Sequence, residues 1–165
     1  MTVVHTIGHS SHSMERFIEL LCQHRIALLA DVRSRPYSRR MPHFQQSALR
    51  RALGAERLEY VYLGHELGGR PAGAEFYAPA GHVDYERRAQ ALDFQAGIEQ
   101  LVLLAGQRST AILCAEEDPA GCHRRLLVAP ALERRGVAVL HIRGDGRLQS
   151  EDELRAPAAQ LRLFD

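Results

Sequence analysis

The sequence predicts a single α/β domain built on a mainly parallel five-stranded sheet with helices on both faces. Five short apolar runs alternate with segments whose apolar residues recur at helical spacing, which indicates strands joined by right-handed crossovers. The run Leu28-Leu29-Ala30 has no polar alternation, as is typical of a parallel strand covered on both faces. With 165 residues, 45% of them hydrophobic, the chain suits one domain with a substantial core.

The expected elements follow one another from the N-terminus. The first strand is rich in β-branched residues and stops at Gly8, and Ser13 is placed to cap the first helix. A polar loop from Asp31 to Arg40 follows the second strand, and the stretch 72–84 is a candidate for a mobile flap. Pro130 is expected to kink or restart the last helix. The expected strands cover residues 3–7, 26–32, 58–63, 109–115 and 137–142, and the expected helices cover residues 14–21, 45–53, 85–105 and 126–135.

The regular pattern stops after Gly144-Asp145-Gly146. We therefore expect a domain over residues 1–146 and a tail over residues 147–165, in which Ser150 and Glu153 cap one short helical turn. No apolar run is long enough to span a membrane, no secretory leader is recognised, and three cysteines disfavour a disulfide framework. We expect a cytoplasmic protein with no membrane association and no resident cofactor.

Candidate functional residues follow the expected strands. Because the carboxyl ends of parallel strands share one edge of the sheet, these residues are expected to converge on one pocket. They are His9, Ser10, Asp31, Arg33, Gly68, Gly69, Arg70, Glu116, Cys122, His123 and Arg124.

Anion binding is the first hypothesis for this pocket. Guanidinium groups hold phosphate or carboxylate bidentately, and six arginines fall between Asp31 and Arg51 against one acid. Glycines before Arg70 would let backbone N–H groups approach the same anion. Alternatively, these arginines form structural ion pairs with acids such as Glu66 and Glu116. The candidate anion-binding residues are Ser10, Arg33, Arg35, Ser38, Arg39, Gly68, Gly69, Arg70 and Arg124.

Two alternatives are open for catalysis. Asp31 and Glu116 are a candidate acid/base pair, although Asp31 also suits helix capping or pairing with Arg33. Cys122, at a predicted helix N-terminus beside His123, is a candidate nucleophile.

The remaining cysteine and histidine positions are weaker candidates. His9 completes the candidate catalytic set because it follows the first strand. Cys114 lies inside an apolar strand, which assigns it to the core. Its spacing from Cys122 and His123 matches none of the usual zinc patterns, so no metal is predicted.

Several blocks of the chain resemble, in the same order, those of a bacterial family called domain of unknown function 488 (DUF488). The resemblance covers roughly residues 3–146 and implies a shared pocket made from these blocks, but it supplies no reaction. The blocks are Thr6-Ile7-Gly8-His9-Ser10, Asp31-Val32-Arg33-Ser34-Arg35-Pro36 with Ser38-Arg39, Leu67-Gly68-Gly69-Arg70, and Cys114-Ala115-Glu116 with Cys122-His123-Arg124.

The C-terminal tail carries a separate motif. Residues 160–164 resemble the pentapeptide by which bacterial DNA polymerases and repair proteins bind the sliding clamp, with Arg162 at the tolerant position. Such a peptide inserts two apolar side chains into a pocket and uses a glutamine as polar anchor. The alternative is that its alternating apolar residues pack on the domain as an edge strand. The candidate partner-binding residues are Gln160, Leu161, Leu163 and Phe164.

Taken together, these patterns favour an enzyme acting on nucleic acid or a nucleotide, as in DNA repair, through glycosidase-like acid/base hydrolysis. The expected partners are DNA or a nucleotide and a DNA sliding clamp. One alternative is an enzyme of a small anionic metabolite with a Cys122/His123 thiol site. Another is a non-catalytic module that binds nucleic acid.

Overall fold

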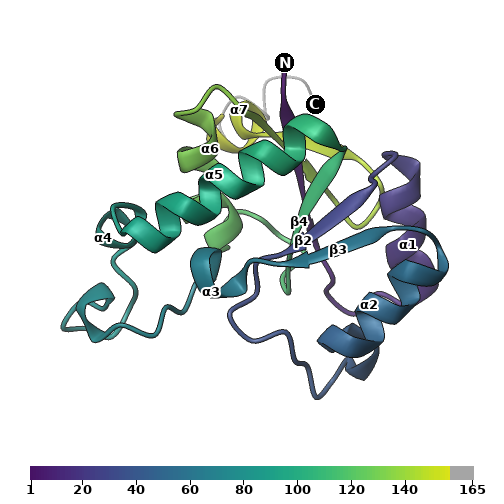
Figure 1. Ribbon diagram of the computed structural model, residues 1–165, viewed down its shortest axis with the longest axis horizontal. Coiled ribbons are helices and arrows are strands. Elements are labelled where there is room, and N and C mark those ends of the chain that lie inside the picture. Colours follow the sequence, from purple (N-terminus) through teal and green to yellow (C-terminus); the bar gives the residue numbers. More distant parts are fainter. Residues whose placement is uncertain (157–165) are drawn as a thin grey trace, which may run out of the picture.

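A computed structural model describes residues 1–156 (Figure 1), and these residues form one mixed sheet of six strands. The strands are β1 (Val3–Gly8), β2 (Leu28–Asp31), β3 (Glu59–Tyr62), β4 (Thr110–Cys114), β5 (Ala138–Ile142) and β6 (Leu148–Ser150). Their order is β3-β2-β4-β1-β5-β6, and all neighbours are parallel except β5 and β6. The predicted α/β class with a mainly parallel sheet is confirmed.

The helices lie close to the predicted positions. Ser13 caps α1 as predicted, because its Oγ accepts a hydrogen bond from the N–H of Arg16 at 3.1 Å. The turn before Pro130 has π geometry, and this proline has no N–H to donate back along the helix. The helices are α1 (Met14–Gln23), η1 (Pro42–Phe44), α2 (Gln46–Ala55), α3 (Gly64–Leu67), η2 (Ala74–Phe76), α4 (Tyr85–Ala89), α5 (Leu92–Gln107), η3 (Arg124–Val128), α6 (Ala129–Glu133) and α7 (Glu151–Arg155). Within the described residues, none of these helices is long and apolar enough to cross a membrane.

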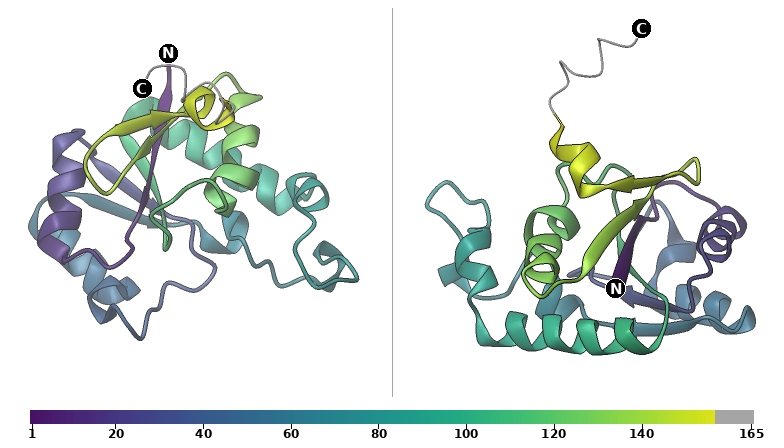
Figure 2. Two further views of the ribbon diagram at one scale, coloured as in Figure 1. Left: turned by 180° about the vertical axis from the view of Figure 1, so that it is seen from behind. Right: turned by 90° about the horizontal axis from the view of Figure 1, so that it is seen from above.

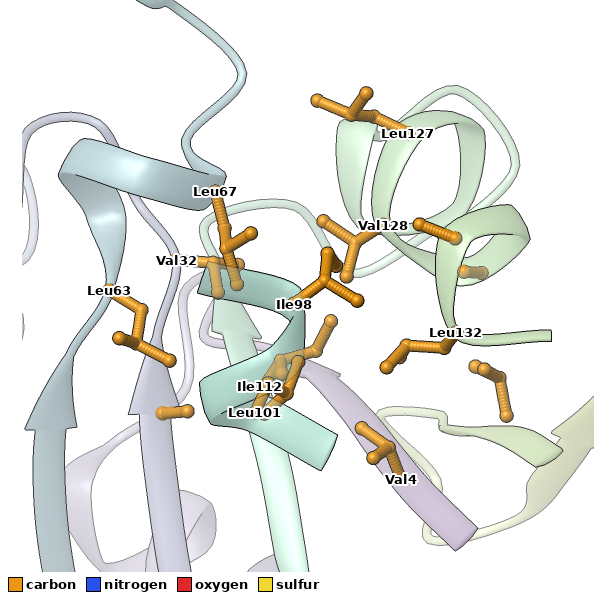
Figure 3. Close-up of a cluster of buried hydrophobic side chains, with 14 of the residues drawn as sticks. Val4, Val32, Leu63, Leu67, Ile98, Leu101, Ile112, Leu127, Val128 and Leu132 are labelled. Carbon is orange, nitrogen blue, oxygen red and sulfur yellow. The ribbon is translucent and has the colours of Figure 1, made fainter. Parts of the chain in front are cut away.

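Both faces of the sheet are covered by helices, as predicted. Buried side chains of α1 and α2, including Phe17 and Leu49, pack on one face. The opposite face is covered by α3, α5, η3 and α6, where Ile98 and Leu132 meet the strand residues Val4 and Ile112 (Figure 3). Figures 1 and 2 show α5 and α1 on opposite sides of the strands. Because the central strands β2 and β4 are buried at every position between two layers, their apolar runs show no alternation.

The structure corrects three expectations. The sheet has six strands rather than five, and the boundary expected at residue 146 falls inside the β5–β6 hairpin, so residues 148–155 belong to the fold. Ser150 does cap the predicted helical turn, α7. The helix expected over residues 85–105 is divided, because Ala91 adopts an extended conformation between α4 and α5. The clamp-binding peptide predicted at residues 160–164 lies outside the described residues.

The segment between α3 and α4 extends away from the sheet (Figure 1) but has defined contacts. Tyr77 and Val83 form an isolated β-bridge. The buried Arg88 of α4 donates to the carbonyl oxygen of Glu66, forms an ion pair with Asp93, and stacks on the ring of Phe76. These contacts attach the irregular segment to the helical layer; the predicted flap motion stays a prediction.

Candidate functional site

The candidate site lies at the carboxyl ends of β2 and β4, which are neighbours in the sheet. After β2 the chain runs to α2 on one face, whereas after β4 it runs to η3 and α6 on the opposite face. Loops that diverge in this way leave a crevice between them. A cavity of about 510 Å³ opens there. A hollow of about 820 Å³ adjoins it, and the two share Ser34, Arg35, Gly69, Arg70 and Tyr85 as lining residues.

The cavity brings together most of the residues predicted from the sequence. Those that line it are His9, Arg33, Arg35, Ser38, Gly69, Arg70, Glu116, Cys122 and His123. Those that do not line it are Ser10, Asp31, Arg39, Gly68 and Arg124. Cys114, which the apolar strand assigns to the core, also lines the cavity, together with Ser34, Tyr37 and Tyr85.

The two cysteines and His123 form a compact cluster in the cavity wall. The thiol of Cys122 donates to the sulfur of Cys114 across 2.9 Å, and His123 Nδ1 lies 3.6 Å from the Cys114 sulfur. The other ring nitrogen, Nε2, lies 3.1 Å from the carbonyl oxygen of Val32. Because a carbonyl can only accept, Nε2 carries a hydrogen, and Nδ1 is the ring nitrogen that faces the sulfurs. The residue that follows β2 therefore orients an imidazole that faces Cys114 at the end of β4 and Cys122 in the turn before η3.

The pair holds its negative charge on one sulfur. The hydrogen bond from Cys122 lowers the pKa of the Cys114 thiol well below its ordinary range, with help from His123 and Arg124 and against the effect of burial. The same hydrogen bond, together with burial, raises the pKa of Cys122, which keeps its proton. These opposite shifts favour Cys114 over Cys122 as the thiolate of the pair.

The cluster also offers three donor atoms of the kinds that bind zinc. The two sulfurs and one imidazole nitrogen all lie within 4.8 Å of one another. Two thiolates on a tetrahedral zinc ion stand about 3.7 Å apart, since each Zn–S bond is about 2.3 Å. The two sulfurs are closer than this, at 2.9 Å. The observed spacing favours a shared proton over a shared metal ion.

Asp31 is a structural residue behind the cavity. It is fully buried, and Arg33 Nε and Nη2 donate to its two carboxylate oxygens at 2.9 and 2.8 Å. Tyr60 adds a third side-chain donor at 2.6 Å. The predicted acid/base pair is therefore not assembled, because Glu116 lines the cavity whereas Asp31 is enclosed by its partners. Arg33 reaches the cavity wall, but its remaining nitrogen, Nη1, donates to the carbonyl of Phe44.

Arg124 also binds groups of the protein itself rather than facing the cavity. Its side chain is fully buried and donates to Thr6 Oγ1 and to the carbonyl oxygens of Glu116 and Glu117. These bonds fix the turn that follows β4. Gly8 of β1 lies against the same turn, where a Cβ atom would stand 1.6 Å from the Glu116 carbonyl oxygen. The geometry of this turn holds Cys114 and Glu116 at the cavity.

The cationic groups that face the cavity are Arg35 and Arg70. Both are exposed and line both hollows, and within residues 1–156 neither guanidinium group is hydrogen-bonded to protein. Arg39 is exposed on the same loop as Arg35 but lies away from the cavity. Of the arginines predicted to bind an anion, Arg35 and Arg70 therefore offer their guanidinium groups to the cavity.

The two glycines before Arg70 serve close packing. A Cβ atom at Gly69 would lie 2.8 Å from the ring carbon Cγ of His123, and one at Gly68 would lie 2.3 Å from Ser34 Oγ. Ser34 Oγ in turn accepts the backbone N–H of Arg70 at 2.8 Å. The glycines therefore let the loop after α3 pack on His123 and place Arg70 at the rim.

His9 contributes a neutral imidazole. Its Nδ1 lies 2.9 Å from the carbonyl oxygen of Ser10, and its ring stacks on Phe44 at a centroid distance of 4.6 Å. Burial lowers the pKa of His9, so the uncharged ring prevails at neutral pH. The backbone N–H of Ser10 donates to the carbonyl of Ala115, which ties the β1 loop to the β4 loop.

Comparison with known proteins gives the family. A family model described as domain of unknown function DUF488 matches residues 13–130, which is more than half of the chain. The chain belongs to the DUF488 family. In this DUF488 protein the matched region contains both cysteines, His123, Arg35 and Arg70. Neither curated proteins nor solved structures gave a significant match.

Proposed function

We propose that this DUF488 protein is an enzyme that uses the thiolate of Cys114 as a nucleophile on a small anionic substrate. The observation that carries the proposal is the hydrogen-bonded Cys114–Cys122 pair in the wall of a cavity rimmed by Arg35 and Arg70. A thiolate is the reactive form of cysteine, and a neighbouring thiol and imidazole preserve it at neutral pH.

The arginines would hold the substrate while the sulfur attacks. A guanidinium group binds carboxylate or phosphate through two parallel N–H donors, and both groups are available at the rim. Attack joins the Cys114 sulfur to an electrophilic atom of the substrate, and the bond from that atom to its leaving group breaks, so that the leaving group departs with the electron pair. His123 Nδ1, 3.8 Å from the Cys122 sulfur, is placed to accept the Cys122 proton.

A nucleotide or nucleic acid is the second candidate substrate class. The wider hollow is lined by Tyr77, His82 and Tyr85, whose rings suit stacking on a base, and it shares both arginines with the cavity. Arg39 and Arg40 extend the positive charge along the loop after β2. With this second candidate we also propose a role in DNA repair, binding of a sliding clamp by the tail, and a cytoplasmic location.

Thiol alkylation tests the proposal. In a Cys22→Ser background, which removes the exposed cysteine, iodoacetamide should label Cys114 faster than it labels the urea-unfolded chain. Inorganic phosphate or AMP should slow this labelling, and the Arg35→Ala/Arg70→Ala variant should lose the protection while keeping the unprotected rate. Protection by AMP alone would select the nucleotide class. Labelling no faster than in the unfolded chain would refute the thiolate nucleophile.

A further inference from the structure

The spacing of the two cavity cysteines suits a bond between them as well as a hydrogen bond. Their sulfurs are 2.9 Å apart, and a disulfide bond of about 2.05 Å would require an approach of about 0.9 Å. Cys114 ends β4 whereas Cys122 lies in the turn before η3, so the approach does not require a change in strand pairing. Both cysteines are free in the structure. The site therefore contains a dithiol that can close without rearrangement of the sheet.

We infer that Cys114 and Cys122 are a dithiol–disulfide couple that donates two electrons to a small amino-acid or peptide disulfide bound in the cavity. The inference rests on the proposed function, because it uses the same Cys114 nucleophile. It adds the reaction class, a thiol–disulfide exchange, and it assigns Cys122 as the resolving thiol.

The two cysteines have unequal roles in this exchange. Cys114 accepts the hydrogen bond and attacks first, whereas Cys122, its donor, keeps its proton until the mixed disulfide has formed. His123 Nδ1 lies 3.6 and 3.8 Å from the two sulfurs, and Nε2 of the same ring lies 3.1 Å from the carbonyl oxygen of Val32. One imidazole can therefore remove the Cys122 proton at the second step.

The charges around the cavity select the substrate class. Arg35 and Arg70 offer guanidinium groups to carboxylates, and Glu116 on the same wall offers a carboxylate to an ammonium group. Amino acids and short peptides carry both charges. Cys114 is 7% exposed and Cys122 is 3% exposed, so the disulfide of a folded protein cannot reach them, whereas a small disulfide can enter the cavity.

The exchange balances in two steps. The Cys114 thiolate attacks one sulfur of R–S–S–R, so that a Cys114–S–S–R bond forms and R–S⁻ leaves. His123 Nδ1 then takes the Cys122 proton, and the Cys122 thiolate attacks the Cys114 sulfur. The Cys114–Cys122 bond forms, and the second R–S⁻ leaves and receives the proton from His123. The protein is oxidised by two electrons and the substrate is reduced to two thiols; a low-molecular-weight thiol returns the electrons by the reverse exchange.

The experiment uses the reduced full-length Cys22→Ser protein with glutathione disulfide as the probe. After an acid quench and treatment with N-ethylmaleimide, we expect a mass loss of about 2 Da, no maleimide adduct, and a Cys114–Cys122 cross-linked peptide. With Cys122→Ser added, the mixed disulfide should accumulate at Cys114. With Cys114→Ser added, the reaction should be roughly 100-fold slower, because the thiolate is lost.

Matched controls separate the inference from the proposed function. Hydroxyethyl disulfide, which carries no charge, should react about tenfold more slowly than glutathione disulfide, and equal rates would overturn the substrate class. A mixed disulfide that persists in the Cys22→Ser protein would overturn the couple but leave the Cys114 nucleophile standing. No reaction of Cys114 with either disulfide or with iodoacetamide would overturn both.

Discussion

Replacement of Asp31 by Asn tests whether this residue supports the fold or performs chemistry. The Asp31 carboxylate is fully buried and accepts two side-chain bonds from Arg33 and one from Tyr60, and Arg33 itself is only 5% exposed. Asn keeps the shape but leaves the buried guanidinium without a counter-charge. Breaking a buried ion pair costs about 3–5 kcal/mol, so the free energy of unfolding should fall by that amount. For a chain of this size the midpoint of thermal unfolding should drop by roughly 10 °C.

Urea titration of Asp31→Asn, Arg33→Met and the double variant measures this effect. The loss of unfolding free energy in the double variant should be smaller than the sum of the losses in the two single variants, because no unpaired buried charge remains. Glu59→Gln, at the exposed Glu59–Arg108 pair, is the matched control and should change stability by under about 1 kcal/mol. A loss below about 1 kcal/mol in Asp31→Asn, together with abolished Cys114 reactivity, would refute the structural role and restore Asp31 to the mechanism.

Three further predictions concern pH and the tail. Between pH 6 and 8 the alkylation rate of Cys114 should stay nearly constant, whereas a thiol with a pKa of about 8.5 gains about 75-fold; a similar gain at Cys114 would show that it is no thiolate. The hydrogen bond from Arg143 lowers the pKa of Glu117 from 4.5 to about 2, so its stabilisation is present above pH 4.5 and lost as the pH falls towards 2. Acid unfolding followed by circular dichroism should therefore be less steep over this range in Glu117→Gln, and an unchanged curve would contradict the assignment. The intact chain should bind a bacterial sliding clamp with micromolar affinity, about −8 kcal/mol, in a calorimetric titration, and deletion of residues 160–165 should abolish this binding. Equal binding by the intact and the truncated chain would show that the tail is not the clamp-binding segment.

Local features of the sequence account for most of the fold. Ser13 caps α1 because its hydroxyl and the first helical turn are neighbours along the chain. The buried strands β2 and β4 are recognisable because residues covered on both faces are mostly apolar and show no alternation. By contrast, β6 is three residues long with no fully buried side chain, and its pairing with β5 depends on a hairpin rather than on a pattern of its own.

The candidate site was predictable in position but not in the roles of its residues. The rule that strand ends share one edge placed His9, Glu116, Cys122 and His123 together. The same rule applied to Cys114, the last residue of β4, but the apolar run before it favoured the core. A pattern of residue types does not show which way a strand-end side chain turns.

The sequence by itself determined the α/β class, the order of the elements and the sheet edge where the polar residues gather, because these depend on periodicity and on neighbours along the chain. Only the tertiary structure decided that the guanidinium groups of Arg33 and Arg124 bind partners inside the protein while those of Arg35 and Arg70 face the cavity. It also decided that the sulfurs of Cys114 and Cys122 lie in contact. Which side chains contact one another depends on distances of a few ångströms between residues that are far apart in sequence. These distances are set by the packing of the whole sheet and its helices.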